Sequence, residues 1–423
     1  MFNVHYGFNQ RIFLDATYRR EGNSRFSSEN KYGNFWSVGA SWNLSQESFL
    51  GAPTWLSNLS LKASYGVNGN AGIGNFLYLS RFGYGASYDD YPVMYYTGIR
   101  NQDLTWEVNK PLNLGLDFGF FDGTLSGSFN YFNRETESLL LDVPLSRTTG
   151  HNTITRNEGA MINEGFELSL NTQNVSSGNF QWTTDFNITK VQNEVTELSR
   201  NIEGDYKEII DGYKRIKVGD NVRTFYMRKY AGVNPENGNP LWYLNGKGGE
   251  TTNQWSQAER ANQGNSMPEI YGGLSNTFSY GGLSLSFQFN YSLEYKVFGV
   301  WDQYLLSEGR AFLYYNQYEK IMERWQEPGD QTDVPKVVLG GNNRSYETST
   351  RYLYDGDHIR LRNVTLSYQL PESAINNLNM ENFRLFVRGT NLWTYNFDED
   401  LKFDPETGDE GLLNLQVPNL KTL

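Results

Sequence analysis

The clearest pattern in the sequence is a strict alternation of apolar and polar positions from Leu283 to Lys296, which reads LSLSFQFNYSLEYK. Leucine, phenylalanine and tyrosine occupy every second position, and serine, glutamine and asparagine occupy most of the others. A period of two places the two sets on opposite faces of an extended strand. The segment is much longer than the usual strand of about 5–6 residues. It therefore predicts one long β-strand with an apolar face and a polar face.

The same alternation recurs along the whole chain, and its polar positions are mainly serine, asparagine, glycine and glutamine. The further segments are Ile12–Tyr18, Trp36–Leu44, Leu59–Val67, Leu112–Phe120, Leu125–Tyr131, Phe166–Leu170, Phe180–Ile188, Leu274–Tyr280, Val364–Leu370 and Leu385–Val387. We expect about twelve long strands, with a short one at Met1–Gly7 and the start of another near Leu420.

The connections between the predicted strands alternate in length. Short turns are expected at Phe8–Arg11, Asp122–Gly123, Ser176–Asn179 and Gly281–Gly282, with an intermediate one at Pro371–Asn382. Long excursions are expected at Asn68–Leu104, Leu139–Ile162, Asn193–Glu269, Val297–Asp355 and Thr394–Pro418. Short turns at one end and long loops at the other, joining strands with one apolar face, are typical of outer-membrane barrels.

These features predict an all-β fold, a transmembrane antiparallel β-barrel. Aromatic residues near predicted strand ends suit interfacial girdles, namely Trp36, Trp42, Trp55, Trp106, Trp182, Tyr295 and Trp393. The alternative is a soluble or surface-attached β-sandwich that binds glycans, although sandwich strands are shorter and their polar faces carry more Lys, Glu and Thr. A third hypothesis is a secreted glycosidase that uses loop carboxylates such as Asp89 and Asp90.

Composition excludes several classes of protein. The 423 residues include no cysteine, which excludes disulfide scaffolds, cysteine nucleophiles and thiolate metal sites. The three histidines lie far apart in sequence and leave little for a His-based metal site. The formal charge of −12, with no basic block, argues against nucleic acid as a partner. No apolar run reaches the roughly 18 residues that a membrane helix needs. The chain has no GxSxG or HExxH motif, so we expect neither an enzyme nor a cofactor.

Short motifs in a fixed order carry a resemblance. They include KYGNFWSVGASWNLSQESFL, NQDLTWEVNKPLNLGLDFGFFDGTLSGSFNYF, NEGAMINEGFELSL, YAGVNPENGNPLWY, DGDHIRLRNVTLSYQLP and FRLFVRGTNLWTY. Their order along the whole chain resembles the SusC/RagA family of TonB-dependent outer-membrane transporters. The resemblance implies a barrel of about 22 strands. Residues 1–423 would supply its C-terminal part, about twelve strands, and the N-terminal plug, the first ten or so strands and the end of the last strand would lie outside this chain. Such a portion is expected to fold only within a longer chain.

The resemblance also implies a function. It predicts TonB-dependent active import of a nutrient across the outer membrane of a Gram-negative bacterium, with an oligosaccharide or other glycan as the first expectation and a peptide as the second. The implied partners are a SusD-like outer-membrane lipoprotein that closes over the extracellular mouth, the TonB–ExbB–ExbD complex acting through the plug, and outer-membrane lipid.

Candidate site residues fall into three sets. The stretch Val300–Trp325 predicts a helix in an extracellular loop, where aromatic rings would stack on sugars, contact the lipoprotein or hold the loop together; these are Trp301, Tyr304, Tyr314 and Tyr315. Polar side chains expected to line the lumen are Gln288, Asn290, Arg360 and Arg362, and the arginines would alternatively pair with Asp117, Asp185 and Glu294. In the acidic loop Phe397–Gly411, Asp398, Asp400 and Asp404 are weak calcium candidates. Because their spacing does not follow an EF-hand, a solvated loop without metal is the preferred interpretation.

Overall fold

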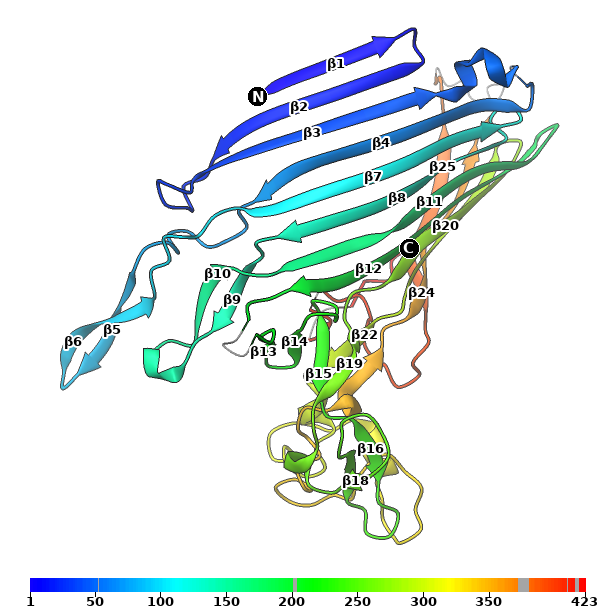
Figure 1. The fold of residues 1–423 in the computed structure, drawn as a ribbon. Coiled ribbons are helices and arrows are strands. Elements are labelled where there is room, and N and C mark those ends of the chain that lie inside the picture. The colour runs from blue at the N-terminus through cyan, green and yellow to red at the C-terminus, as the bar shows by residue number, and fades with distance from the viewer. Residues whose placement is uncertain (52, 201–203, 372–379, 409, 415–417) are drawn as a thin grey trace. The chain divides into compact units, whose positions relative to one another are not determined.

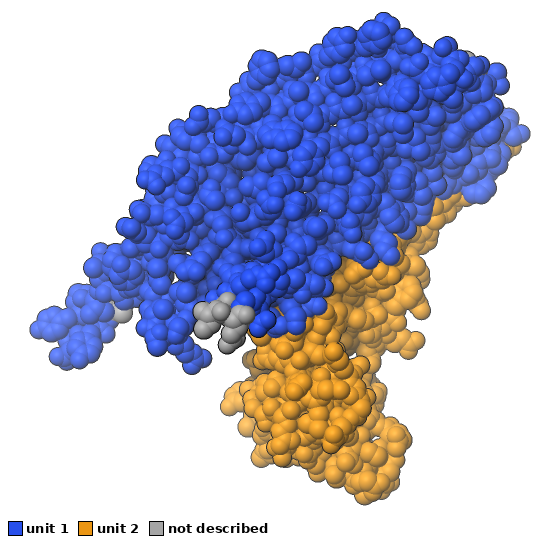
Figure 2. Space-filling view, viewed as in Figure 1, with its two compact units in different colours: residues 1–209, 216–222 blue, residues 210–215, 223–423 orange. Residues whose placement is uncertain are grey.

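Figure 1 shows a computed structural model of the chain, which describes residues 1–51, 53–200, 204–371, 380–408, 410–414 and 418–423. The chain divides into two compact units, coloured separately in Figure 2. Unit 1 comprises Met1–Ile209 and Ile216–Val222, and unit 2 comprises Ile210–Arg215 and Arg223–Leu423. Within the described residues, no helix is long and apolar enough to cross a membrane.

Unit 1 is built on eight long antiparallel strands that run side by side in chain order (Figure 1). They are β1 (Phe2–Phe8), β2 (Ile12–Gly22), β3 (Tyr32–Asn43), β4 (Leu56–Asn70), β7 (Glu107–Phe120), β8 (Leu125–Glu137), β11 (Ala160–Ser177) and β12 (Phe180–Glu197). The expected turns at Phe8–Arg11, Asp122–Gly123 and Ser176–Asn179 join consecutive strands. At Asp122 (φ 54°) and Gly123 (φ 87°) the backbone enters the left-handed region, which lets two strands reverse directly.

The long excursions of unit 1 carry further hairpins, which lie at the opposite end of the strands from the short turns (Figure 1). The excursion after β4 contains β5 (Arg81–Tyr88) and β6 (Tyr91–Gly98), and the excursion after β8 contains β9 (Leu140–Pro144) and β10 (Thr153–Asn157). Short 3-10 turns complete the unit: η1 (Leu44–Gln46), η2 (Ser48–Leu50) and η3 (Arg147–Thr149). The predicted contrast between short and long connections is therefore confirmed.

Unit 2 contains four long antiparallel strands in the order β20-β21-β24-β25. Their bounds are β20 (Ile270–Tyr280), β21 (Leu283–Leu293), β24 (His358–Gln369) and β25 (Arg384–Asn396). Smaller elements build the loop assembly of this unit: β13 (Ile209–Asp211), β14 (Lys214–Ile216), β15 (Thr224–Met227), β16 (Tyr230–Val233), β17 (Pro240–Tyr243), β18 (Thr251–Thr252), η4 (Trp255–Gln257), β19 (Ala261–Asn265), β22 (Lys296–Gly299), α1 (Asp302–Leu305), η5 (Glu319–Glu323), η6 (Thr350–Tyr352), β23 (Leu353–Asp355) and β26 (Leu412–Leu413).

Strand register turns the alternation of the sequence into two chemically distinct faces. One row of directly paired residues crosses seven strands of unit 1 and is entirely apolar: Ile12, Trp42, Leu61, Leu116, Phe129, Leu168 and Ile188. The neighbouring row points to the other face and, after Phe13 of β2, reads Ser41, Lys62, Gly115, Asn130, Glu167 and Thr189. Unit 2 repeats this, with Phe278, Leu285, Leu366 and Val387 in one row and Ser275, Gln288, Asn363 and Thr390 in another.

The apolar face is not covered within unit 1. Trp42, Leu61 and Phe129 are 38%, 42% and 42% exposed, whereas a β-sandwich would bury such a face against a second sheet. Buried apolar clusters form instead where loops meet strands, for example Phe26, Leu104 and Trp106 with Phe35 of β3 in unit 1. The β-sandwich alternative is therefore wrong, and an uncovered apolar face is what the wall of a β-barrel presents.

Two of the proposed girdle residues do not face outward. Trp106 is 6% exposed, packs between Phe26 and Phe35, and donates its indole N–H to the Lys31 carbonyl. Tyr295 is 5% exposed and lies in a cluster with Val297. Both residues lie in segments where loops fold over the strand ends, so their rings are needed for packing.

The structure corrects three local predictions. The strand predicted from Leu283 to Lys296 ends at Leu293, because the backbone of Glu294 turns to φ 63° before β22 begins. The helix predicted over Val300–Trp325 is wrong apart from the short α1 and η5, and Gly309 (φ 107°) ends any helical continuation. Near Leu420 there is an isolated bridge between Thr390 and Thr422 rather than a strand. Much of the turn predicted at Pro371–Asn382 lies outside the described residues.

Candidate functional site

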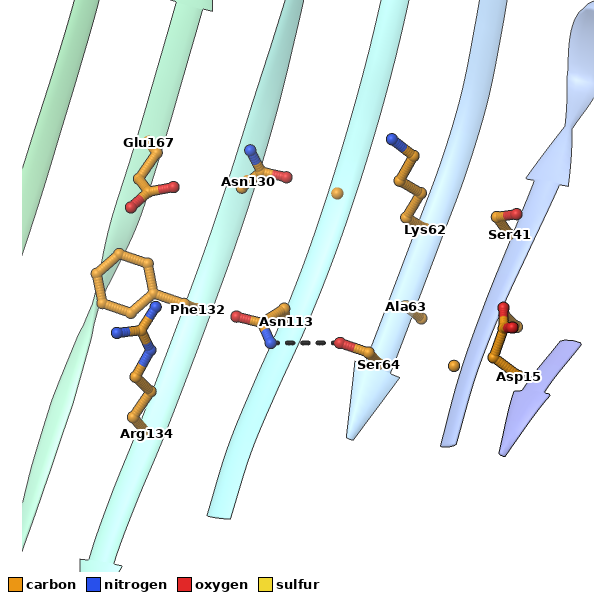
Figure 3. A pocket seen from close by; sticks show the side chains of 13 residues that line it. Asp15, Ser41, Lys62, Ala63, Ser64, Asn113, Asn130, Phe132, Arg134 and Glu167 are labelled. Carbon is orange, nitrogen blue, oxygen red and sulfur yellow. Dashed lines mark hydrogen bonds between the residues drawn. The ribbon is translucent and has the colours of Figure 1, made fainter. Parts of the chain in front are cut away.

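The polar face of unit 1 forms a hollow of about 530 Å³. Its side chains come from neighbouring strands, because every second residue of each strand points to this face. Figure 3 shows Asp15 from β2, Ser41 from β3, Lys62 and Ser64 from β4, Asn113 from β7, Asn130 and Arg134 from β8, and Glu167 from β11. These residues are distant in sequence, and only the register of the sheet brings them together.

Contacts within the hollow are sparse and local. Asn113 Nδ2 donates to Ser64 Oγ at 3.3 Å, Lys62 pairs with Asp117, and the Arg134 guanidinium lies 5.0 Å from the centroid of the Phe132 ring. Hydroxyl, amide and charged groups of both signs thus share one surface. Such a surface can hydrogen-bond a hydrated polar solute, and its side chains match the wet interior of a membrane barrel.

The polar face of unit 2 carries three of the four residues expected to line the lumen. Gln288 accepts a hydrogen bond from Asn363 Nδ2 at 3.0 Å, and Asn290 pairs in register with Arg360 of β24. Arg362 lies at a β-bulge between Leu361 and Asn363, and its guanidinium donates to Asn391 Oδ1 at 3.1 Å.

Both arginines are neutralised by a segment that follows β25. We call residues 398–406 the acidic strap. Arg360 makes a two-pronged pair with Asp404, and Arg362 donates to Glu406 Oε1 at 2.5 Å. His358 Nε2 lies 3.7 Å from the same Glu406 oxygen. Their carboxylate partners are therefore in the strap, whereas Asp117, one of the partners suggested by the sequence, pairs with Lys62.

The strap carboxylates are held in the charged form. Burial alone would raise the pKa of Glu406, but the neighbouring His358 ring and the guanidinium groups of Arg360 and Arg362 outweigh it and lower this pKa to about 2. Burial likewise opposes ionisation of Asp404, yet hydrogen bonds from Arg360 and from backbone N–H groups hold its pKa below the usual range.

The three calcium candidates are separated from one another by their partners. Asp398 accepts a hydrogen bond from the backbone N–H of Asp355 at 2.9 Å, Asp400 pairs with Lys320 at 2.8 Å, and Asp404 is bound to Arg360. Across the described ranges, no group of three or more His, Asp or Glu side chains is arranged to hold a metal ion.

The four candidate aromatic residues divide into a cluster and a single exposed ring. Trp301, Tyr304 and Tyr315 pack on one another with ring centroids 5.5 to 6.0 Å apart. Tyr314 is 79% exposed, and the adjacent Leu313 is 81% exposed. The cluster holds the loop together, and the pair Leu313 and Tyr314 is free to contact another molecule.

A second exposed aromatic surface lies on the β5–β6 hairpin of unit 1, which the sequence analysis did not single out. Tyr84, Tyr88 and Tyr91 are each more than 70% exposed. Asp89 and Asp90, the carboxylates of the glycosidase hypothesis, form the tip of this hairpin with positive φ angles of 49° and 64°. They are neighbours in an exposed turn rather than residues facing each other across a cleft.

The sequence analysis also missed a buried ion pair in the loop assembly of unit 2. Glu308 is 0% exposed, and its two carboxylate oxygens accept hydrogen bonds from Arg351 at 2.5 and 2.6 Å. Ser345 Oγ donates to the same carboxylate at 2.7 Å. No local pattern marks Glu308, because its partner lies 43 residues away in the chain.

Comparison with known proteins places this geometry in a family. A model described as "TonB dependent receptor-like, beta-barrel" matches residues 2–392. The chain is 31% identical to TonB-dependent receptor P3 of Formosa agariphila over 93% of this chain and 40% of that protein. It is 28% identical to TonB-dependent receptor SusC of Bacteroides thetaiotaomicron over 86% of this chain and 37% of that protein.

A comparison with solved structures supports the same family. A chain of the RagAB peptide transporter superimposes with a TM-score of 0.88 and 29% sequence identity, covering 99% of this chain and 46% of that chain. The present chain thus spans about two fifths of the length of the named receptors, and somewhat less than half of the RagAB chain. The two-faced strands, the family match and these relatives lead to one conclusion: the chain belongs to the TonB-dependent receptor β-barrel family and is of the SusC/RagA type.

Proposed function

We propose that this chain forms the C-terminal part of the barrel wall of an outer-membrane importer in a Gram-negative bacterium. The observation that carries the proposal is the pair of neighbouring rows in unit 1, one apolar across seven strands and the other mainly polar from β3 to β12. A wall with these faces meets lipid on one side and a water-filled lumen on the other. The polar hollow around Lys62 and Asn113 then lies on the path of the solute.

The wall would act together with segments that residues 1–423 do not supply. In this proposal an N-terminal plug and about ten further strands complete the barrel. The TonB–ExbB–ExbD complex pulls on the plug and so couples import to the proton gradient. The chain's own residues bind and guide the solute and carry out no bond chemistry.

A SusD-like lipoprotein is the proposed extracellular partner. Exposed tyrosines on the β5–β6 hairpin and the exposed pair Leu313 and Tyr314 support it, because exposed aromatic groups are enriched where proteins contact one another. Replacing Tyr88 and Tyr91 by serine should reduce co-purification of the lipoprotein with the intact transporter. Serine replacement of Tyr280, an exposed tyrosine at the short turn after β20, is the matched control.

The proposed cargo is an oligosaccharide, with a peptide as the second candidate. Glycan is the expectation from the SusC-type motifs, and peptide is favoured by the 29% identity to a chain of the RagAB peptide transporter. Hydroxyl and amide side chains of the polar face would hydrogen-bond either solute.

Uptake measurements test the proposal. Cells with and without the gene receive labelled maltooligosaccharides or a mixture of labelled short peptides, and accumulation is measured with and without a protonophore. We expect accumulation of one of the two classes that is lost both on deletion and on collapse of the proton gradient. Recovery of the gene product in the aqueous soluble fraction, or gene-dependent accumulation that survives the protonophore, would contradict the proposal.

A further inference from the structure

The loop assembly of unit 2 encloses a cavity of about 320 Å³ that no residue of the long strands lines. Its walls come from α1, η5, β23 and the acidic strap, and they include the apolar side chains of Leu306, Val334 and Phe403. The volume lies at the lower end of the range of about 300–1,000 Å³ that is usual for small-molecule sites. It suits a group the size of one amino acid or one monosaccharide.

One wall of this cavity contains a buried carboxylate, Asp302, which is 1% exposed. Its Oδ1 accepts a hydrogen bond from the Tyr318 hydroxyl at 3.0 Å, and its Oδ2 accepts one from the Tyr354 hydroxyl at 2.7 Å. Among the residues that the structure describes, no lysine or arginine lies within ion-pair distance of this carboxylate. A buried charge without an opposite charge is costly, by several kcal/mol per ion.

Several other charged groups of the cavity already have partners, including Lys402, whose Nζ donates to the Glu399 carbonyl, while Glu319 contributes a further carboxylate to the wall. Lys320 lies between Asp333 at 3.1 Å and Asp400 at 2.8 Å, and Arg351 is bound to Glu308. These pairs fix the walls, but they leave Asp302 without a counter-charge. The glycine at position 299 makes room for this carboxylate, because a Cβ there would lie 2.1 Å from Asp302 Oδ2.

We propose that Asp302 is the binding site for a primary ammonium group of a small ligand that occupies this cavity. An ammonium group has three N–H donors, and the carboxylate and the two phenol oxygens offer free lone pairs to accept them. The rings of Tyr318 and Phe403 would pack around the rest of the ligand, and an aromatic face also attracts a cation. Two kinds of molecule present this chemistry, the amino terminus of a peptide and an amino sugar. The inference concerns binding and stands whether or not the chain takes part in import.

The protonation of Asp302 supplies an independent readout. Burial raises the pKa of this carboxyl, and the hydrogen bonds from Tyr354 and Tyr318 offset the effect only in part. An ammonium ligand binds the ionised carboxylate. Its affinity should therefore fall on acidification at a pH above the usual carboxyl value of about 3.9. A carboxylate with a purely structural role would not make ligand affinity depend on pH in this way.

The test measures ligand affinity on the full-length gene product, extracted from cells in detergent. The probes are alanyl-alanine amide and glucosamine, each compared with its N-acetylated form, and dissociation constants come from saturation-transfer NMR titrations. We expect one amine probe to bind and its acetylated form to bind at least about tenfold more weakly. Binding of the peptide probe alone assigns the site to peptide termini, and binding of glucosamine alone assigns it to amino sugars.

Substitutions test whether Asp302 itself, rather than the rest of the cavity, binds the ammonium group. Asp302→Asn should weaken the amine probe by at least about tenfold and leave the acetylated probe unchanged. Asp333→Asn, which alters another carboxylate of the same cavity that is already paired with Lys320, is the matched control and should change affinity by less than about threefold. Equal binding of amine and acetylated probes, or no binding of either amine at millimolar concentration, overturns the proposal. Because these comparisons use the unmodified protein, they decide the matter even if Asp302→Asn does not fold.

Discussion

The two faces of β7 predict opposite costs for the same substitution at two adjacent residues. Asn113 and Leu114 lie near the middle of this strand. Leu114 belongs to an apolar row with Ala63 and Tyr131, and it is 45% exposed. Asn113 points to the polar face, where its side chain makes one hydrogen bond of 3.3 Å to Ser64. An arginine at either position therefore lies at the same depth of the barrel wall, but it faces lipid at position 114 and the water-filled lumen at position 113.

The two arginine variants are expected to lose different amounts of folding free energy. Leu114→Arg places a charge in lipid near the bilayer midplane, which costs about 2–4 kcal/mol in outer-membrane barrels. Asn113→Arg removes one hydrogen bond, worth about 0.5–1.5 kcal/mol, and keeps the charge in the wet lumen. Leu114→Ala is the matched control for lost packing. Because the exposed part of this leucine meets lipid rather than water, we expect its truncation to cost about 0.8 kcal/mol for each CH2 group removed.

The assay is the free energy of unfolding of the intact protein in lipid vesicles. Urea titrations would follow tryptophan fluorescence, and the mobility of unheated samples on gels would report the folded fraction. The interpretation of the two faces is refuted if Asn113→Arg costs as much as Leu114→Arg. It is also refuted if Leu114→Arg is no more destabilising than Leu114→Ala.

Three further predictions concern the loops and the edges of the sheet. Because the pKa of Glu406 is lowered to about 2, the stability that it adds to the acidic strap is present above about pH 4.5 and is lost as pH falls through 2. The protection of the Asp404 and Glu406 amides against hydrogen exchange, relative to the rate of an unstructured peptide at the same pH, should fall over that range and should not in Glu406→Gln. Arg351→Met leaves the buried Glu308 unpaired and should lower the free energy of unfolding by about 3–5 kcal/mol, seen as faster proteolysis of residues 300–350. Adding Glu308→Gln to this variant should restore part of the lost stability. Equal protease sensitivity of the single and the double variant would contradict this prediction. Residues 1–423 alone should give no stable heat-modifiable band on a semi-native gel, because the strand edges at β1 and β25 need partners; such a band would disprove the expectation.

Local patterns in the sequence were sufficient to predict the strands, the polarity of their two faces and the family. The alternation in Leu283–Leu293 reports a period of two, which depends only on neighbouring residues and on the geometry of an extended backbone. The same pattern placed Gln288 and Asn290 on the polar face, where the register confirms them. It overran the end of the strand at Glu294, because a turn to positive φ in a non-glycine residue has no signature in hydrophobic periodicity.

Loop structure was not predictable in the same way. The aromatic residues of Val300–Trp325 allowed a helix, but the buried pair between Glu308 and Arg351 and the left-handed Gly309 impose a different path. Helical propensity is a weak term of about 0.7 kcal/mol or less per ordinary residue, so tertiary contacts of this strength override it.

The sequence by itself determined that this is a wall of long two-faced strands, because side-chain alternation and turn length are encoded within a few residues. Only the tertiary structure decided which charges are free and which are neutralised. Arg360 is paired with Asp404, 44 residues away, while Asp302 is left without a counter-charge beside a cavity. The energy of a charge depends on its burial and on partners brought together by chain folding, and neither quantity can be read from neighbours in sequence.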